Sequence, residues 1–352
     1  MRGVNFGGWF SQVDAVAAND PSQVSGLRAH LESFLGPADF ARVKAWGFDH
    51  VRLPVDYFNV FTGPELAPNE PVLGLLDRAV DGLRAAGLRV IFDLHKCPGH
   101  DFLEGTAADQ SFFSDPARRA DARKVWTHLA ERYGHRPGVL LEILNEPVAP
   151  DAATWNAVKD EMAAHIRRHA PKATIVVGAN RWNYVGEFAQ LTPVEDDNIL
   201  YSFHFYLPLL FTHQRAPWMP DRHFQETRPY PGEYAVPPGT RSRVPLETGR
   251  WDRARMAQAL EPVIRFRERF EASVSCHEFG VYAGGADRAS QLAWMRDFLS
   301  LLREHDFGWS YWNYRNLDFG LISRNEARFA QSPQYDNPER TDHEMVRLLA
   351  AH

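Results

Sequence analysis

The sequence predicts an α/β protein folded as a single (β/α)8 TIM barrel. Short apolar runs alternate with longer segments that repeat apolar residues at helical spacing, along nearly the whole chain. Reactive side chains stand at the ends of most of these runs, where a barrel would gather them on one face. A length of 352 residues is within the range of one such barrel. An open doubly wound sheet is the alternative, but no GxGxxG or Walker A motif supports it.

Eight apolar runs are predicted as strands, because each is short and is followed by a loop or helical pattern. Several of them end on a polar or charged residue, which matters for the site described below. The predicted strands are residues 3–8, 50–54, 88–94, 139–144, 173–178, 199–205, 273–276 and 307–312.

The intervening segments are predicted as helices. Residues 71–86 repeat apolar side chains at helical spacing, and Gly87 ends the pattern. Asp115 and Pro116 begin another helix, with proline in the first turn, where its missing N–H costs nothing. The predicted helices are residues 37–46, 71–86, 115–133, 152–169, 253–270, 288–305 and 343–350.

One connection is unusually long. Residues 207–252 separate the sixth strand from its helix and are rich in proline, arginine and aromatic residues. A loop of this length in a compact domain is usually functional or disordered, and the aromatic content argues against full disorder. We therefore expect one catalytic domain, residues 1–352, with residues 207–252 as an insertion that forms a wall or lid of a cleft. An excursion packed on the outside of the barrel is the alternative.

Composition excludes several classes of function. The chain has 39 basic and 45 acidic residues, a net charge of −6, which gives no support for nucleic-acid binding. No apolar stretch is long enough to span a membrane. The two cysteines, Cys97 and Cys276, are too few for a disulfide framework or a structural zinc site. The chain opens on a predicted strand, so we expect a cytoplasmic protein if this N-terminus is native, and a secreted one if a signal peptide was removed.

Two glutamates stand at the carboxyl ends of predicted strands. Glu146 follows the run 139–144, and Glu278 follows the run 273–276. Because the carboxyl ends of barrel strands meet on one face, these two side chains are expected to face each other. A pair of carboxylates, one a proton donor and the other a nucleophile or base, is what glycoside hydrolysis requires.

Other reactive side chains occupy similar strand-end positions. A single polar residue at a strand end is weak support for a site, but their number and order indicate a shared one. They are Arg52, Asp93, His95, Asn145, His204, Tyr206, Trp312 and Asn313. A metal hydrolase or a serine hydrolase is disfavoured, because neither an HExxH nor a GxSxG motif is present. We expect no metal and no cofactor.

The ordered set of motifs resembles glycoside hydrolase family 5, the cellulase-like branch of clan A. The motifs that carry the resemblance run over nearly the whole chain. They are Gly3-Val4-Asn5, Arg52-Leu53-Pro54, His95, Asn145-Glu146-Pro147, His204-Phe205-Tyr206, Glu278-Phe279-Gly280 and Trp309-Ser310-Tyr311-Trp312.

The resemblance implies a retaining double-displacement mechanism, with Glu146 as acid/base and Glu278 as nucleophile. It also implies that Arg52 lies beside Glu278 and keeps it ionised, and that Asn145 binds the sugar 2-hydroxyl. The remaining implied roles are substrate contacts: His204 and Tyr206 frame the carboxylates, His95 contacts sugar hydroxyls, and Trp312 stacks on a sugar ring.

The expected substrate is a β-linked glucan or gluco-oligosaccharide. A glycolipid, a mannan or a heteroglycan is the alternative, because the family uses one scaffold for several sugars. A carbohydrate-binding barrel without activity is the non-enzymatic alternative, and the presence of both glutamates argues against it. The long insertion favours a pocket and cleavage from chain ends, but linkage, endo or exo action and oligomeric state are left open.

Overall fold

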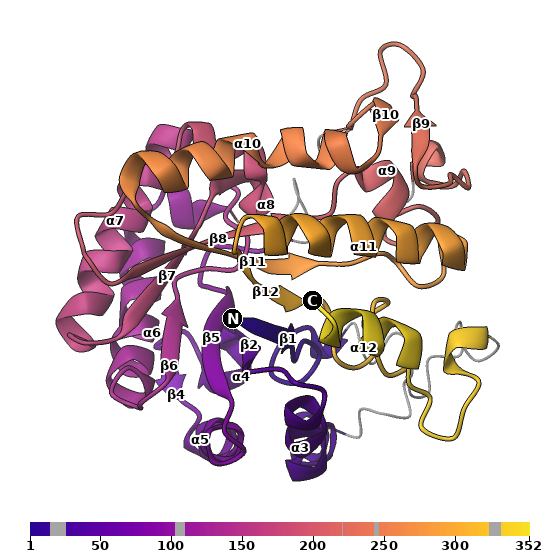
Figure 1. The fold of residues 1–352 in the computed structure, drawn as a ribbon. Helices are drawn as coiled ribbons and strands as arrows, with labels where there is room; N and C mark the ends of the chain where they lie inside the picture. The colour runs from indigo at the N-terminus through magenta and orange to yellow at the C-terminus, as the bar shows by residue number, and fades with distance from the viewer. Residues whose placement is uncertain (15–25, 103–109, 220, 243–245, 324–331) are drawn as a thin grey trace.

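The computed structural model describes residues 1–14, 26–102, 110–219, 221–242, 246–323 and 332–352. Its centre is a closed barrel of parallel strands in the order β1-β12-β11-β8-β7-β6-β5-β2, with β2 pairing back onto β1. Helices lie outside the strands (Figure 1). The predicted (β/α)8 barrel is therefore confirmed.

All eight predicted strands are barrel strands. Their bounds are β1 (Arg2–Asn5), β2 (His50–Asp56), β5 (Arg89–Lys96), β6 (Val139–Glu142), β7 (Thr174–Gly178), β8 (Ile199–Phe205), β11 (Ser273–Phe279) and β12 (Gly308–Tyr311).

Two strand ends differ from the prediction in ways that affect the site. β6 ends at Glu142, so Glu146 lies on the loop beyond it. β11 continues to Phe279, so Glu278 lies within the strand, and its register against β8 shifts between Cys276 and Glu278. Such a bulge re-aims the side chains next to it, and bulges are frequent beside active sites.

The long helices agree closely with the prediction. They are α3 (Pro37–Ala45), α5 (Glu70–Ala85), α6 (Pro116–Tyr133), α7 (Ala152–His169), α10 (Arg253–Phe270), α11 (Arg288–Glu304) and α12 (His343–Ala350). In five of them an aspartate carboxylate accepts a backbone N–H of the first turn, which satisfies a donor that the helix leaves unpaired. These caps are Asp115, Asp151, Asp252, Asp287 and Asp342.

The shorter elements were not predicted. They are the helices α2 (Leu27–Ser33), α4 (Tyr57–Val60), α8 (Asn180–Asn183) and α9 (Leu209–Thr212), and the hairpin of β3 (Phe61–Thr62) with β4 (Ala67–Pro68). Elements this short carry too few repeats for a periodic pattern to identify them. None of the helices in the described ranges combines the length and the apolar composition that a membrane span requires.

The barrel interior changes from apolar to charged along the strands. A small buried apolar cluster is formed by Ile91, Leu140, Val176 and Leu200. Side chains alternate between the two faces of a strand, so the next inward positions on β5 and β6 are Asp93 and Glu142. The amino-terminal part of the interior is thus filled with hydrocarbon, and charged side chains occupy the carboxyl-terminal part.

The insertion between β8 and α10 has structure of its own. It contains α9 and an antiparallel pair, β9 (Gly232–Tyr234) with β10 (Gly249–Trp251), and it is described except at residues 220 and 243–245. In Figure 1 the pair projects beyond the end of α10. Tyr230 connects the insertion to α11, because the Tyr230 hydroxyl donates a hydrogen bond to Asp297 Oδ2 at 2.8 Å.

Candidate active site

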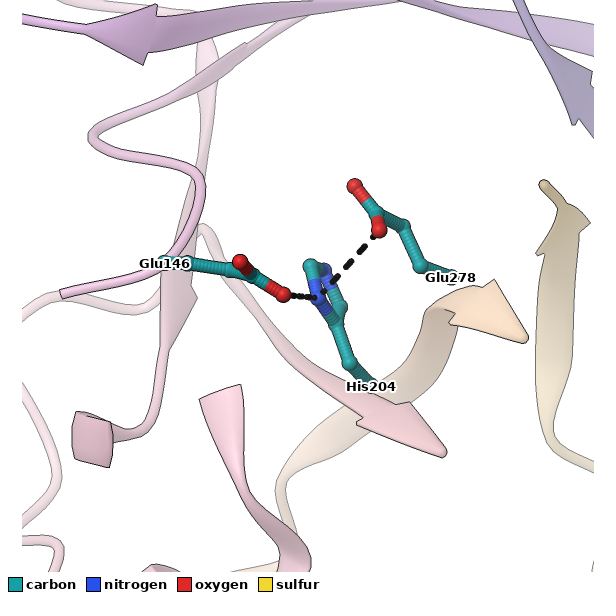
Figure 2. A group of neighbouring side chains, drawn as sticks. All are labelled: Glu146, His204 and Glu278. Carbon is teal, nitrogen blue, oxygen red and sulfur yellow. Dashed lines mark hydrogen bonds and ion pairs between the residues drawn. The ribbon is translucent and has the colours of Figure 1, made fainter. Parts of the chain in front are cut away.

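Glu146 and Glu278 lie opposite each other at the carboxyl end of the barrel, with His204 of β8 between them (Figure 2). His204 Nδ1 is 2.8 Å from Glu146 Oε1 and 3.6 Å from Glu278 Oε2. One oxygen of each carboxylate and a ring nitrogen of His204 lie within 4.8 Å of one another. The glutamate side chains are only 12% and 7% exposed. The structure therefore brings the two predicted carboxylates together and buries both almost completely.

The separation of the two carboxylates is informative about the reaction. Retaining glycosidases hold their carboxyl groups about 5–5.5 Å apart, whereas inverting enzymes leave about 6.5–9.5 Å for a water molecule. One oxygen of Glu146 and one of Glu278 lie within 4.8 Å of each other, which is closer to the retaining than to the inverting separation.

Arg52 is the centre of a buried network beneath the carboxylates. Its side chain is fully buried, and each of its three nitrogens has at least one partner. A guanidinium has five N–H donors in a fixed plane, so such a network fixes its orientation. The partners are Glu278 (2.7 Å), Asn145 (2.7 Å), Glu142 (2.8 Å), Asp93 (3.0 Å) and Asn5 (3.0 Å).

Burial outweighs the arginine in the electrostatics of Glu278. Desolvation raises the pKa of Glu278 to about 7, although Arg52 and the hydroxyl of Tyr206 both lower it. The expected contact with Arg52 is present and lowers the pKa of Glu278, but burial raises that pKa by more. The two partners offset only part of the cost of placing a charge in a closed site.

The pKa of Glu146 is raised well above its ordinary value. The largest cause is burial, and the second is the negative charge of Glu278. Among the described residues, no arginine bonds directly to Glu146. Arg52, by contrast, contacts Glu278 at 2.7 Å. The two carboxylates therefore stand in different surroundings, and Glu146 is the one better suited to hold a proton.

Tyr206 and Asn145 flank the pair. The Tyr206 hydroxyl donates to Glu278 Oε2 at 3.0 Å. Asn145 Oδ1 accepts from Arg52 Nη2, and its Nδ2 has no hydrogen-bond partner within the described part of the chain. A buried amide that lacks a partner is costly, so it marks a position where a ligand could accept a hydrogen bond.

His95 and Trp312 form a third side of the site. Their rings are parallel, with centroids 5.8 Å apart and an interplanar angle of 1°. His95 Nδ1 is 2.7 Å from Asp93 Oδ2, while its Nε2 has no partner among described atoms. Gly7 lies against the indole, and a Cβ at Gly7 would come within 2.6 Å of Trp312 Cη2.

Comparison with known proteins decides the family. The family model described as cellulase, glycosyl hydrolase family 5, matches residues 13–318. This chain belongs to glycoside hydrolase family 5. Endoglucanase C of Acetivibrio thermocellus is 32% identical to it over 339 residues, which cover 94% of this chain and 95% of that protein. Cellodextrinase A of Ruminococcus flavefaciens is 32% identical to it over 284 residues, which cover 80% of this chain and 76% of that protein.

Solved structures share the fold of this family 5 hydrolase. The endoglucanase Cel5A from Thermotoga maritima superposes with a TM-score of 0.74 at 20% identity, covering 99% of this chain and 96% of that one. The family model and the endoglucanase relative make the protein a cellulase-like glycosidase, and the structural likeness shows the shared barrel fold.

Sequence reasoning missed part of the family 5 hydrolase's site. Glu142 is buried and contacts Arg52, whereas the apolar character of the run 139–144 predicts only a buried strand there. It is the one charged residue of the run 139–144, and that was the available signal. Asn313, at a predicted strand end, bonds instead to the backbone of Gly7 and Arg315. Cys97 and Cys276 are buried and are not joined in a disulfide.

Glu146, His204 and Glu278 could also approach a metal ion together. A metal bound by these three residues would, however, occupy both Glu146, which is suited to hold a proton, and Glu278, which is paired with Arg52. The chemistry of paired carboxylates needs these groups free. The absence of a metal remains a prediction.

Proposed function

We propose that this enzyme hydrolyses β-1,4-linked glucans and their oligosaccharides with retention of anomeric configuration. The approach of Glu146 and Glu278 within 4.8 Å, in different surroundings, carries the proposal. The β-1,4-glucan is favoured by the relatives, since an endoglucanase and a cellodextrinase match over most of the chain. A glucan 1,3-β-glucosidase of Blumeria graminis matches only 42% of it.

In the first step Glu278 attacks the anomeric carbon while Glu146 gives its proton to the leaving oxygen. Burial lowers the pKa of His204 far below its ordinary value, so its ring is neutral. The neutral ring of His204 donates Nδ1–H to Glu146 Oε1, 2.8 Å away. The other oxygen of Glu146 therefore carries the proton that is transferred to the leaving group. In the second step Glu146 takes a proton from a water molecule whose oxygen attacks the anomeric carbon, and the bond between that carbon and Glu278 breaks to release the sugar and the free carboxylate.

The other site residues bind the glycone in this proposal. Asn145 offers its free Nδ2–H to the sugar 2-hydroxyl, a contact that strengthens in the transition state. His95 presents its free Nε2 to another hydroxyl. Trp312, held against His95, provides the face on which a sugar ring stacks.

We propose that the insertion 207–252 forms one wall of the cleft. Two of its residues lean toward the site: the ring of His213 packs on Tyr206 at 5.2 Å, and that of Trp218 packs on Phe319 at 6.1 Å. Trp218 is 41% exposed. The relative named an endoglucanase aligns with this chain over 95% of its own length. We therefore propose cleavage within glucan chains, rather than the cleavage from chain ends that the length of the insertion favours.

The test is hydrolysis of a substrate panel by wild type and Glu278→Gln. The panel contains aryl β-glucoside, β-cellobioside and β-mannoside, and cello-, laminari- and manno-oligosaccharides. We expect wild type to cleave the cello series and Glu278→Gln to be inactive. Proton NMR of the first product should show the β-anomer. An α-anomer as first product would refute retention, and preferred cleavage of the laminari or manno series would refute the substrate.

A further inference from the structure

Glu142 is a fully buried carboxylate directly beneath the catalytic pair. It comes from β6 and is 0% exposed, so it cannot touch a substrate. Its two oxygens accept from Arg52, Oε2 from Nε at 2.8 Å and Oε1 from Nη2 at 3.2 Å. His277 Nδ1 lies 3.1 Å from Oε2. The proposed two-step reaction assigns no role to this group.

The contact between Glu142 and Arg52 is a side-on fork. Two parallel hydrogen bonds from Nε and Nη2 fix the plane of a guanidinium, which a single contact would not do. With that plane fixed, Nη1 is aimed at Glu278 Oε1 and Nη2 at Asn145 Oδ1, each at 2.7 Å. These are the proposed nucleophile and the residue proposed to bind the 2-hydroxyl.

Glu142 also carries a permanent negative charge. Burial opposes its ionisation, but Arg52 and His277 outweigh burial and hold its pKa at about 2. Glu142 and Glu278 therefore compete for one arginine, and the charge of Glu142 is among the causes that raise the pKa of Glu278. The titratable and charged groups that face these two carboxylates are Arg52 (β2), Asp93 (β5), Glu146 (after β6), His204 (β8), Tyr206 (after β8), and Cys276 and His277 (β11).

We propose that Glu142 is a positioning residue for the nucleophile. It holds Arg52 side-on, so that the guanidinium faces Glu278 and Asn145, and it divides the positive charge of Arg52 between two carboxylates. The inference rests on the proposed function.

The experiment compares three variants by the pH dependence of kcat/KM on an aryl β-cellobioside. Glu142→Gln removes the charge and half of the fork, Glu142→Asp keeps the charge but is too short for the fork, and Asp196→Asn is the control. Asp196 makes the same side-on fork with Arg167, at 2.7 and 2.9 Å, from the loop before β8. Thermal unfolding of each variant gives its loss of stability.

For Glu142→Gln we expect the acid limb to move about one unit to lower pH, because Glu278 gains a larger share of Arg52. Its plateau should fall roughly 10- to 100-fold, because the guanidinium loses one of the two parallel bonds that set its plane and is held less precisely. Glu142→Asp should lose rate with an unmoved limb, and Asp196→Asn should lose stability with neither change.

An acid limb of Glu142→Gln that coincides with wild type would overturn the inference, as would an equal displacement in Asp196→Asn. Should Glu142→Gln fail to fold, an unaltered plateau in Glu142→Asp would overturn the positioning role. Carbon NMR titration of δ-labelled glutamates, with Glu278→Gln to assign the signal, reads the pKa of Glu278 without substrate. An inactive wild type would therefore count against the proposed function and leave this readout of Glu142 intact.

Discussion

At the scale of single residues, the site makes two glutamates different by their neighbours. Glu278 has Arg52 at 2.7 Å and Tyr206 at 3.0 Å, both of which favour its charged form. Glu146 has His204 at 2.8 Å and no contact with Arg52, and its protonated form is favoured by burial and by the negative charge of Glu278. Two identical side chains can thus serve as nucleophile and acid because their environments separate their proton affinities.

Glu146→Ala should slow cleavage according to the leaving group. For cello-oligosaccharides, kcat/KM should fall about 10²- to 10⁴-fold, the usual contribution of a general acid. For a dinitrophenyl cellobioside it should change little, because that leaving group needs no proton. Steady-state kinetics on both substrates tests this, with the surface variant Glu131→Ala as control. Equal losses on both substrates would exclude Glu146 as the acid.

The pH profile should follow Glu278. Because its pKa is raised to about 7, kcat/KM should fall about tenfold per unit below pH 7, where the nucleophile is protonated. The alkaline limb should report Glu146, which must keep its proton and whose pKa is raised by burial and by the charge of Glu278. Tyr206→Phe removes a hydrogen bond that favours the charged form of Glu278, so its acid limb should move to higher pH. An unmoved or lowered limb would contradict this reading of the tyrosine.

Asn145→Ala should lose its effect on a substrate that lacks the 2-hydroxyl. On an aryl β-glucoside we expect kcat/KM to fall roughly 10²- to 10³-fold, as when one transition-state donor is removed. On the 2-deoxy analogue the loss should be much smaller. Asn145 also contacts Arg52, and that loss affects both substrates equally, so the double-mutant cycle isolates the 2-hydroxyl contact. Additive losses would show that Asn145 does not bind this hydroxyl.

At the scale of elements, alternation along the strands delivers the site residues. Inward positions on β5 lead from Ile91 through Asp93 to His95, and those on β8 lead from Leu200 to His204. The same strands therefore supply both the apolar plug and the reactive rim. The bulge in β11 breaks this alternation at Glu278, which lets His277 and Glu278 both contact groups at the centre of the barrel.

The loop after β1 should be sensitive at Gly7. A methyl group there would lie 2.6 Å from Trp312 Cη2 and 3.1 Å from Leu317 Cδ1, so Gly7→Ala should displace the indole. We expect kcat/KM on cello-oligosaccharides to fall about tenfold or more.

Gly74→Ala is the matched control for Gly7→Ala. Its new methyl would meet nothing closer than 3.9 Å within α5. It should stabilise the protein by about 0.5–1 kcal/mol, as alanine does in a helix, with unchanged kinetics. Urea unfolding and steady-state kinetics of both variants test these expectations. Wild-type activity in Gly7→Ala would show that the Trp312 indole does not need its present position.

At the scale of the whole molecule, the insertion 207–252 adds to one side of a complete barrel. It is fastened to α11 through Tyr230, and its exposed Trp218 stacks edge-on against Tyr282 at 5.3 Å. Tyr282 is buried and follows β11, the strand that carries the proposed nucleophile, so the exposed ring of Trp218 packs against a segment next to that strand. Aromatic faces of this kind suit sugar rings.

Trp218→Ala should therefore weaken cleavage of long chains more than of short substrates. We expect kcat/KM on cellohexaose to fall about tenfold, roughly the contribution of one aromatic contact, and kcat/KM on an aryl cellobioside to change little.

Wild type should lower the viscosity of a soluble glucan quickly relative to the number of reducing ends it releases. A slow fall in viscosity would indicate cleavage from chain ends, and an equal loss on both substrates would place Trp218 outside the substrate path.

Much of the molecule followed from local pattern. The bounds of α7, α10 and β8 agree with the prediction to the residue, because apolar spacing and aspartate caps are local signals. The order of the strand-end residues carried the family, and the structure brings Glu146, Glu278, Arg52 and Tyr206 together as that order implied.

Only the tertiary structure decided the electrostatics. Arg52 and Glu278 are 226 positions apart in the chain, and no local pattern reveals that Glu142 shares the same arginine. The pKa of Glu278 rises despite Arg52 because burial, a property of the closed barrel, is the larger effect. Sequence by itself determined the eight barrel strands, the long helices and the reactive side chains near the strand ends, since those depend on neighbours along the chain. How strongly each side chain holds its proton depends on neighbours in space, and these exist only once the barrel has closed.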